Sequence, residues 1–182
     1  MLSRAQIDAA LPKLGDGVRR YRELQTTIHA AKFSASLPFR RKYCYFYGIT
    51  PHRDAQWQSQ FFDLLVSVRY APMVFSDALD ELHNRTRCVE ASFASKLVAS
   101  VNTDLPVIDK YVLLNAGLRL PYPSHSARIA EIKRLYAKLD SMMRSFLGTP
   151  DGRHLVAEFG VRYSTTLISE IKMLDFVLWQ TR

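Results

Sequence analysis

Apolar residues recur every three or four positions along most of the chain, which is the spacing of one face of an α-helix. The segment from Ser126 to Pro150 is the clearest case. Its apolar side chains are Ile129, Ile132, Leu135, Tyr136, Leu139, Met143 and Phe146. Gly148 and Pro150 then end the pattern, as a glycine and a following proline commonly do. A chain with this spacing is expected to bury one stripe of each helix in a shared core.

The same spacing predicts helices over most of the remaining sequence. They begin near Asp16, Thr50-Pro51, Ser76, Val89, Lys110 and Pro150, and a final helix carries apolar residues from Leu167 to Leu178. Only Tyr43 to Tyr47 alternates in the manner of a strand. A chain of 182 residues is long enough for one domain with its own core. We therefore expect a single compact all-α domain over residues 1–182, with about seven to nine helices.

The charge of the chain favours an anionic partner. Lysine and arginine number 25 against 17 acidic residues, which gives a formal charge of +8 and suits nucleic acid. The apolar runs are too short to cross a bilayer, and the start MLSRAQIDAA has no apolar signal region. The two cysteines and five scattered histidines lack the spacing of metal ligands. We expect a monomeric cytoplasmic protein with no metal, no cofactor and no membrane contact.

One carboxylate stands out in the segment SKLVASVNTDLPVIDKYVLLNAGL. Asp109 precedes a helix expected over residues 110–116, where its side chain can cap the first backbone amides. Pro106 fixes the approach to this helix, and Val107 and Ile108 are expected to bury the loop. Asp109 is therefore a carboxylate of defined orientation. It is either a helix cap alone or a cap that also takes part in chemistry.

This segment resembles the active-site region of the helix-hairpin-helix DNA glycosylase superfamily. There an apolar helix, a short loop and a Pro-Val-Asp-type signature lead into the next helix. The matching residues are Pro106, Val107, Asp109, Val112, Gly117 and Leu118, within an active-site region of about residues 89–120. The turn before the first helix, Arg87-Cys88-Val89-Glu90, lacks the glycines of the family, and Ile108 is an extra residue. The chain is thus identified as a divergent member.

The resemblance implies an enzyme that flips a damaged or modified base out of double-stranded DNA and hydrolyses its N-glycosidic bond. Asp109 would stabilise the positive charge that develops on the sugar and orient the attacking water. Relatives that also cleave the backbone carry a Schiff-base lysine near the position of Ser92. Lys96 lies one helical turn later. This favours a monofunctional hydrolase, with Lys96 left either as a catalytic residue or as a phosphate contact.

The segment FRRKYCYFY offers the groups that an extruded base would need. Aromatic side chains can stack on a base, and those here are Tyr43, Tyr45, Phe46 and Tyr47. Basic side chains can hold DNA phosphates, and the candidates are Arg40, Arg41, Lys42, Arg85, Arg87 and Lys110. The alternative is a buried strand or loop with a charged edge, together with ordinary surface charges.

Two questions about function stay open at this stage. The excised base could be a repair target such as an oxidised or alkylated purine, or a bulky base of the kind that phages use to mask their DNA. The second would make the protein an antiviral enzyme. The alternative from another class is a non-catalytic helical domain that binds DNA or RNA, in which Asp109 is a cap and nothing more.

Overall fold

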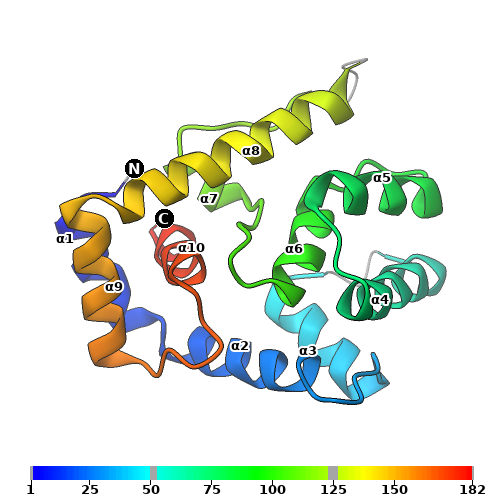
Figure 1. Ribbon diagram of the computed structural model, residues 1–182, viewed down its shortest axis with the longest axis horizontal. Helices are drawn as coiled ribbons and strands as arrows, with labels where there is room; N and C mark the ends of the chain where they lie inside the picture. The colour runs from blue at the N-terminus through cyan, green and yellow to red at the C-terminus, as the bar shows by residue number, and fades with distance from the viewer. Residues whose placement is uncertain (1, 50–52, 123–126, 182) are drawn as a thin grey trace.

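The computed structural model describes residues 2–49, 53–122 and 127–181, and these are helical with no strand (Figure 1). The helices are α1 (Arg4–Ala10), η1 (Leu11–Lys13), α2 (Gly15–Ile28), α3 (Leu37–Tyr47), α4 (Ala55–Tyr70), α5 (Phe75–Thr86), α6 (Ala91–Val101), α7 (Lys110–Asn115), α8 (Arg128–Leu147), α9 (Pro150–Arg162) and α10 (Glu170–Gln180). The all-helical class predicted from the apolar spacing is confirmed. The described residues contain ten α-helices, more than predicted, because α1 and α3 were not expected.

The helix α3 corrects the alternating interpretation of Tyr43 to Tyr47. Pro38 lies in its first turn, where a missing N–H costs nothing, and Gly48 ends it in the left-handed region at φ 61°. Phe39 and Tyr43 lie one helical turn apart and are both buried. The aromatic side chains of this segment therefore follow a helical spacing, and the local alternation was incidental.

Several helix starts also differ from the predicted ones. Asp16 lies in the first turn of α2 and does not cap it, and Ser76 lies inside α5, which Val74 precedes. Asp54 caps α4 by accepting a hydrogen bond from the backbone N–H of Trp57 at 2.7 Å. The predicted starts at Thr50-Pro51 and Ser126 lie outside the described residues.

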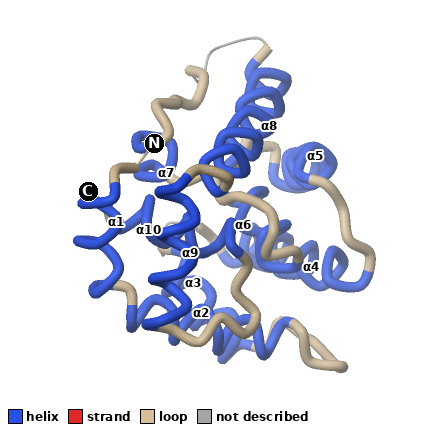
Figure 2. The backbone as a smooth tube through the Cα atoms, turned by 60° about the vertical axis from the view of Figure 1, so that its left-hand side comes forward, coloured by secondary structure: helices blue, strands red, loops and turns tan. Residues whose placement is uncertain are grey.

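Two helices form the centre of the fold. Helix α10 contacts α7, α8 and α9 on one side of the molecule, and α6 contacts α4 and α5 on the other (Figure 1). The tube view separates the same two groups, with α2 and α3 below them (Figure 2). Most side chains of α6 and α10 are buried. Helices α6 and α10 therefore anchor two groups of elements that are far apart in the sequence.

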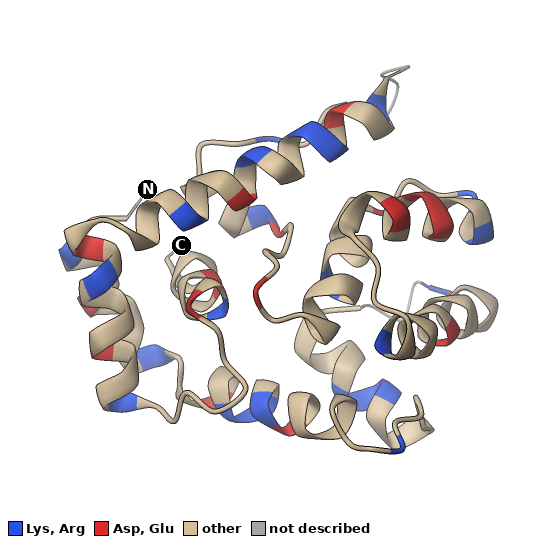
Figure 3. Ribbon diagram, in the orientation of Figure 1, with Lys and Arg blue, Asp and Glu red and all other residues tan. Residues whose placement is uncertain are grey.

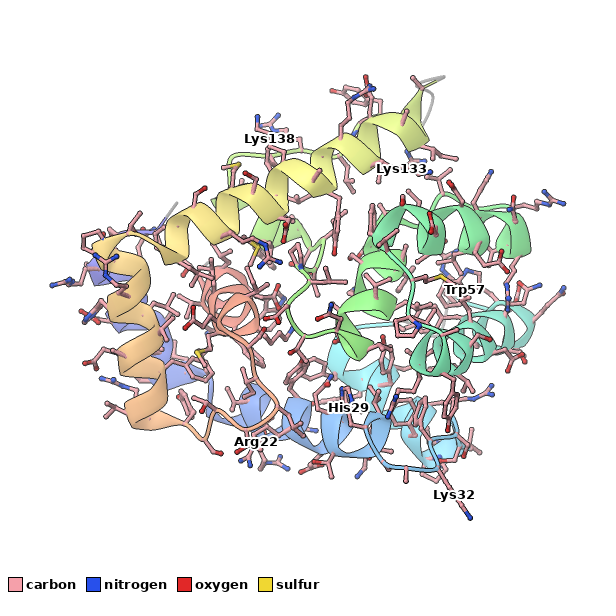
Figure 4. The ribbon with its side chains drawn as sticks, viewed as in Figure 1. Arg22, His29, Lys32, Trp57, Lys133 and Lys138 are labelled. Atoms are coloured by element: carbon pink, nitrogen blue, oxygen red, sulfur yellow. The ribbon has the colours of Figure 1, made fainter. Side chains whose placement is uncertain are left out.

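Charged side chains are distributed unevenly over this framework. Acidic residues gather on α5, whereas lysine and arginine are frequent on α2, α3 and α8 (Figure 3). Lys133 of α8 reaches Asp80 of α5 at 2.5 Å, and Arg22 and Lys32 point away from the helices at the lower edge (Figure 4). Among the described residues, no helix is both long and apolar enough to cross a membrane.

Candidate active site

A cleft of about 620 Å³ opens between α2, α3, α6 and α10, and Asp109 lies in its wall. The side chains that line this cleft include Tyr45, Phe46, Tyr47, Lys96, Asp109, Lys172, Asp175 and Phe176. They come from four separate parts of the chain. The fold thus gathers aromatic, cationic and anionic groups around one hollow.

The loop before Asp109 is held in place at two backbone positions. The N–H of Ile108 donates to Ser95 Oγ of α6 at 2.8 Å, and Tyr136 Oη of α8 donates to the carbonyl of Pro106 at 3.1 Å. Val107 and Ile108 are buried, as the sequence predicted. Both partners, Ser95 and Tyr136, are themselves buried. Because α6 and α8 both fix this loop, the position of the Asp109 backbone is defined by the core.

Asp109 caps α7, as predicted. Its Oδ1 accepts a hydrogen bond from the backbone N–H of Tyr111 at 2.9 Å, and the side chain is only partly buried. The carboxylate also borders a second hollow, an open groove of about 520 Å³ that includes Ser92, Lys110 and Arg119. Asp109 therefore lies at the junction of an aromatic cleft and an open, mostly apolar groove that carries Lys110 and Arg119.

Lys96 projects from α6 into the same cleft as Asp109. Only 8% of its surface is exposed, and its Nζ donates to the carbonyl of Tyr47 at 3.1 Å. Nζ also lies 5.2 Å from the ring centroid of Phe93. Burial lowers the pKa of the Lys96 ammonium, although the carboxylates of Asp109 and Asp175 oppose this shift. An amine of this kind gives up its proton more readily than a lysine in water.

Two further charged residues of the cleft were missed by the sequence interpretation. Lys172 and Asp175 lie on α10 and form an ion pair at 2.5 Å, with 5% and 6% of their surfaces exposed. Burial raises the pKa of Asp175. Burial also opposes the charged form of Lys172, but Asp175, Tyr47 and Asp109 together outweigh it, so the pKa of Lys172 is raised. The available signal was their spacing within EIKMLDFVLW, where two charged residues share one face of an otherwise apolar helix.

The four predicted base-pocket aromatics separate into two groups. Tyr45, Phe46 and Tyr47 line the cleft. Tyr43 is fully buried in the core, where its hydroxyl lies 2.9 Å from Ser100 Oγ. Tyr43 therefore helps to fix α3 against α6 and does not reach the cleft. A helix presents these side chains in different directions, so they do not all face the same hollow.

The predicted DNA-binding residues also have different surroundings. Arg40 donates through Nε to the carbonyl of Ala35 at 2.7 Å, and its guanidinium packs over Phe62, so this side chain supports α3. Arg41 and Lys42 are exposed on the same helix. Lys42 Nζ lies 3.7 Å from Glu23 Oε2 of α2.

The other three basic candidates lie on α5, after it, and on α7. Arg85 Nε lies 2.7 Å from Glu81 Oε1, so part of its guanidinium already has an acidic partner. Arg87 is exposed and ends α5 in the left-handed region at φ 57°. Lys110 is exposed at the groove beside Asp109.

Metal binding has no geometric basis in the part of the chain that is described, because no three His, Cys, Asp or Glu side chains converge there. Comparison with protein-family models, curated proteins and solved structures found no match for this chain. The geometry of the cleft and the chemistry that its residues can perform therefore indicate the function.

Proposed function

We propose that this protein is a monofunctional DNA glycosylase of the helix-hairpin-helix type, which extrudes a damaged or modified base from double-stranded DNA and hydrolyses its N-glycosidic bond. The observation that carries the proposal is the position of Asp109. Its backbone is fixed by the core, and its carboxylate lies between an aromatic cleft large enough for a base and an open, mostly apolar groove that carries Lys110 and Arg119. A base in the cleft and a phosphate backbone along the groove would bring the sugar to Asp109.

The order of elements supports the resemblance seen in the sequence. Helices α5 and α6 pack against each other as a hairpin, and the loop from α6 leads through Pro106 to Asp109 at the start of α7. The turn between α5 and α6 lacks glycine, yet Arg87 adopts the left-handed conformation that glycine would favour there. A divergent sequence can thus form a tight helical hairpin without the glycines of the family.

The chemistry follows from a carboxylate beside the reacting sugar. When the bond between the sugar and the base breaks, its electron pair leaves with the base, and positive charge develops on the sugar. Asp109 stabilises this charge, and it can accept a proton from the water that attacks the anomeric carbon. The departing base takes up a proton, and the products are the free base and an abasic site. Tyr45, Phe46 and Tyr47 provide surfaces on which the extruded base can stack.

The burial of Lys96 favours a second candidate activity, cleavage of the abasic site through a Schiff base. A lysine with a lowered pKa is a better nucleophile, and Lys96 lines the same cleft as Asp109. We favour the hydrolytic activity because Nζ of Lys96 already donates to the carbonyl of Tyr47. Borohydride reduction in the presence of abasic DNA separates the two: a covalent adduct that is lost in Lys96→Ala establishes the Schiff base.

The alternative from another class is a helical protein that binds DNA or RNA without catalysis. The test is incubation with duplexes that carry different modified bases, followed by mass spectrometry of the released bases. Bulky phage-type bases and common repair targets belong in the same set, because the cleft volume admits both. Asp109→Asn should abolish release and leave DNA binding largely intact, since asparagine also caps helices well. Asp104→Asn is the matched control, as Asp104 is an exposed residue of the same loop. Equal release by Asp109→Asn and by the wild type would exclude the mechanism.

A further inference from the structure

The ion pair of Lys172 and Asp175 lies on a helix whose other buried residues are apolar. Ile171, Met173, Leu174, Phe176, Val177 and Leu178 are the neighbouring buried residues of α10. A buried ion pair loses the hydration of both ions, so replacing it with apolar residues of similar volume is often neutral or stabilising. Stability alone therefore does not explain why α10 carries this pair.

The pair also has hydrogen-bonding capacity beyond its own contact. An ammonium has three donors and a carboxylate has about four acceptor positions, whereas the two side chains share one hydrogen bond, from Lys172 Nζ to Asp175 Oδ2. Both residues line the cleft. The cleft therefore presents a strong donor and a strong acceptor next to each other.

Aromatic rings surround this polar pair. Lys172 Nζ lies 5.0 Å from the ring centroid of Phe176, and 5.8 Å from those of Phe46 and Tyr47. These three rings also line the cleft. A planar ligand that enters the cleft can therefore contact aromatic rings together with Lys172 and Asp175.

We propose that Lys172 and Asp175 bind the hydrogen-bonding edge of the extruded base. Lys172 donates to a carbonyl oxygen or ring nitrogen of that edge, and Asp175 accepts from the neighbouring N–H. Each natural base carries such a donor next to an acceptor on its pairing edge, whereas an abasic sugar or a non-polar base mimic carries neither. This assignment rests on the proposed function, and it makes the pair the specificity determinant of the cleft.

Binding measurements test the assignment independently of catalysis. Two kinds of duplex are compared. At one central position, opposite an abasic site, the first carries a hydrogen-bonding base and the second carries a non-polar base mimic of the same shape. The bases are the four natural ones and the modified bases of the release screen. The wild type should bind at least one hydrogen-bonding base about tenfold or more tightly than its mimic. The double variant Lys172→Met/Asp175→Leu should lose this preference and bind the mimic as the wild type does.

The double variant is the appropriate one, because removing a single partner would leave a buried unpaired charge and destabilise the fold. Its thermal unfolding temperature should equal or exceed that of the wild type. The assignment is overturned if the wild type shows no preference for any base over its mimic, or if the double variant retains the preference. The proposed catalysis is tested separately, by comparing base release of Asp109→Asn with that of the wild type. Failure of the catalysis is seen in base release, whereas failure of this assignment is seen in the binding preference.

Discussion

Ser95 Oγ accepts a hydrogen bond from the backbone N–H of Ile108 at 2.8 Å, and this contact joins the centre of α6 to the residue before Asp109. Ser95 is fully buried, and its hydroxyl donates to the carbonyl of Ser92 at 2.8 Å. The hydroxyl thus acts as acceptor and donor at once. A small polar residue in an apolar helix therefore sets the position of the candidate catalytic carboxylate.

Ser95→Ala should destabilise the protein and impair its activity. The substitution leaves the Ile108 N–H buried without a partner, which costs about 1–3 kcal/mol. Chemical denaturation measures this loss, and base release should fall as the loop before Asp109 shifts. Ser145→Ala on the exposed face of α8 is the control and should change neither quantity. A Ser95→Ala variant as stable as the wild type would show that this hydrogen bond does not fix the loop.

Lys96→Met should alter the dependence of stability on pH. Burial lowers the pKa of Lys96 in the folded protein below the ordinary value of 10.5, so the unfolded chain holds this proton more tightly. The charged Lys96 therefore lowers the stability of the folded protein. This loss of stability is complete below the folded pKa and disappears as the pH rises to 10.5 and above. As the pH rises, the unfolding free energy of the wild type should therefore increase relative to that of Lys96→Met. Denaturation curves at several pH values measure it, and a constant difference would contradict the prediction.

Removing exposed basic residues that are predicted to bind DNA should weaken DNA binding and lower its salt dependence. Arg87→Ala and Lys110→Ala are the test variants, because both side chains are exposed. Each lost phosphate contact should reduce the slope of log affinity against log salt by about 0.9. Lys32→Ala is the control, since Lys32 points away from the molecule at its lower edge (Figure 4). Equal slopes for all variants would place the DNA on another surface.

Arg87→Gly should stabilise the helical hairpin. Arg87 holds a φ of 57°, where a residue with a side chain is disfavoured by about 1 kcal/mol relative to glycine. Arg87→Ala removes the same side chain without relieving the backbone, so it should show no such gain. Thermal unfolding of the two variants separates the effects. If Arg87→Gly unfolds at or below the temperature of Arg87→Ala, the left-handed turn is not strained.

The local features of this chain were readable from its sequence. The apolar spacing identified most helices, and the residues around Asp109 indicated both its capping role and the burial of Val107 and Ile108. These features depend on neighbours within a few positions, which is why periodicity and capping rules find them. The segment Tyr43 to Tyr47 was one exception, because a short alternating run of aromatics fits either a strand or a helix.

The composition of the cleft was decided only by the tertiary structure. Lys172 and Asp175 of α10 line the same cleft as Lys96 of α6 and Asp109, and Tyr43 leaves the predicted pocket because α3 turns it into the core. Such contacts join residues far apart in the chain, and each depends on the packing of several helices at once. The sequence by itself determined a helical protein with one carboxylate held at a helix start. Long-range packing determined which charges and rings surround that carboxylate, because the direction of a side chain is set by the helix that carries it.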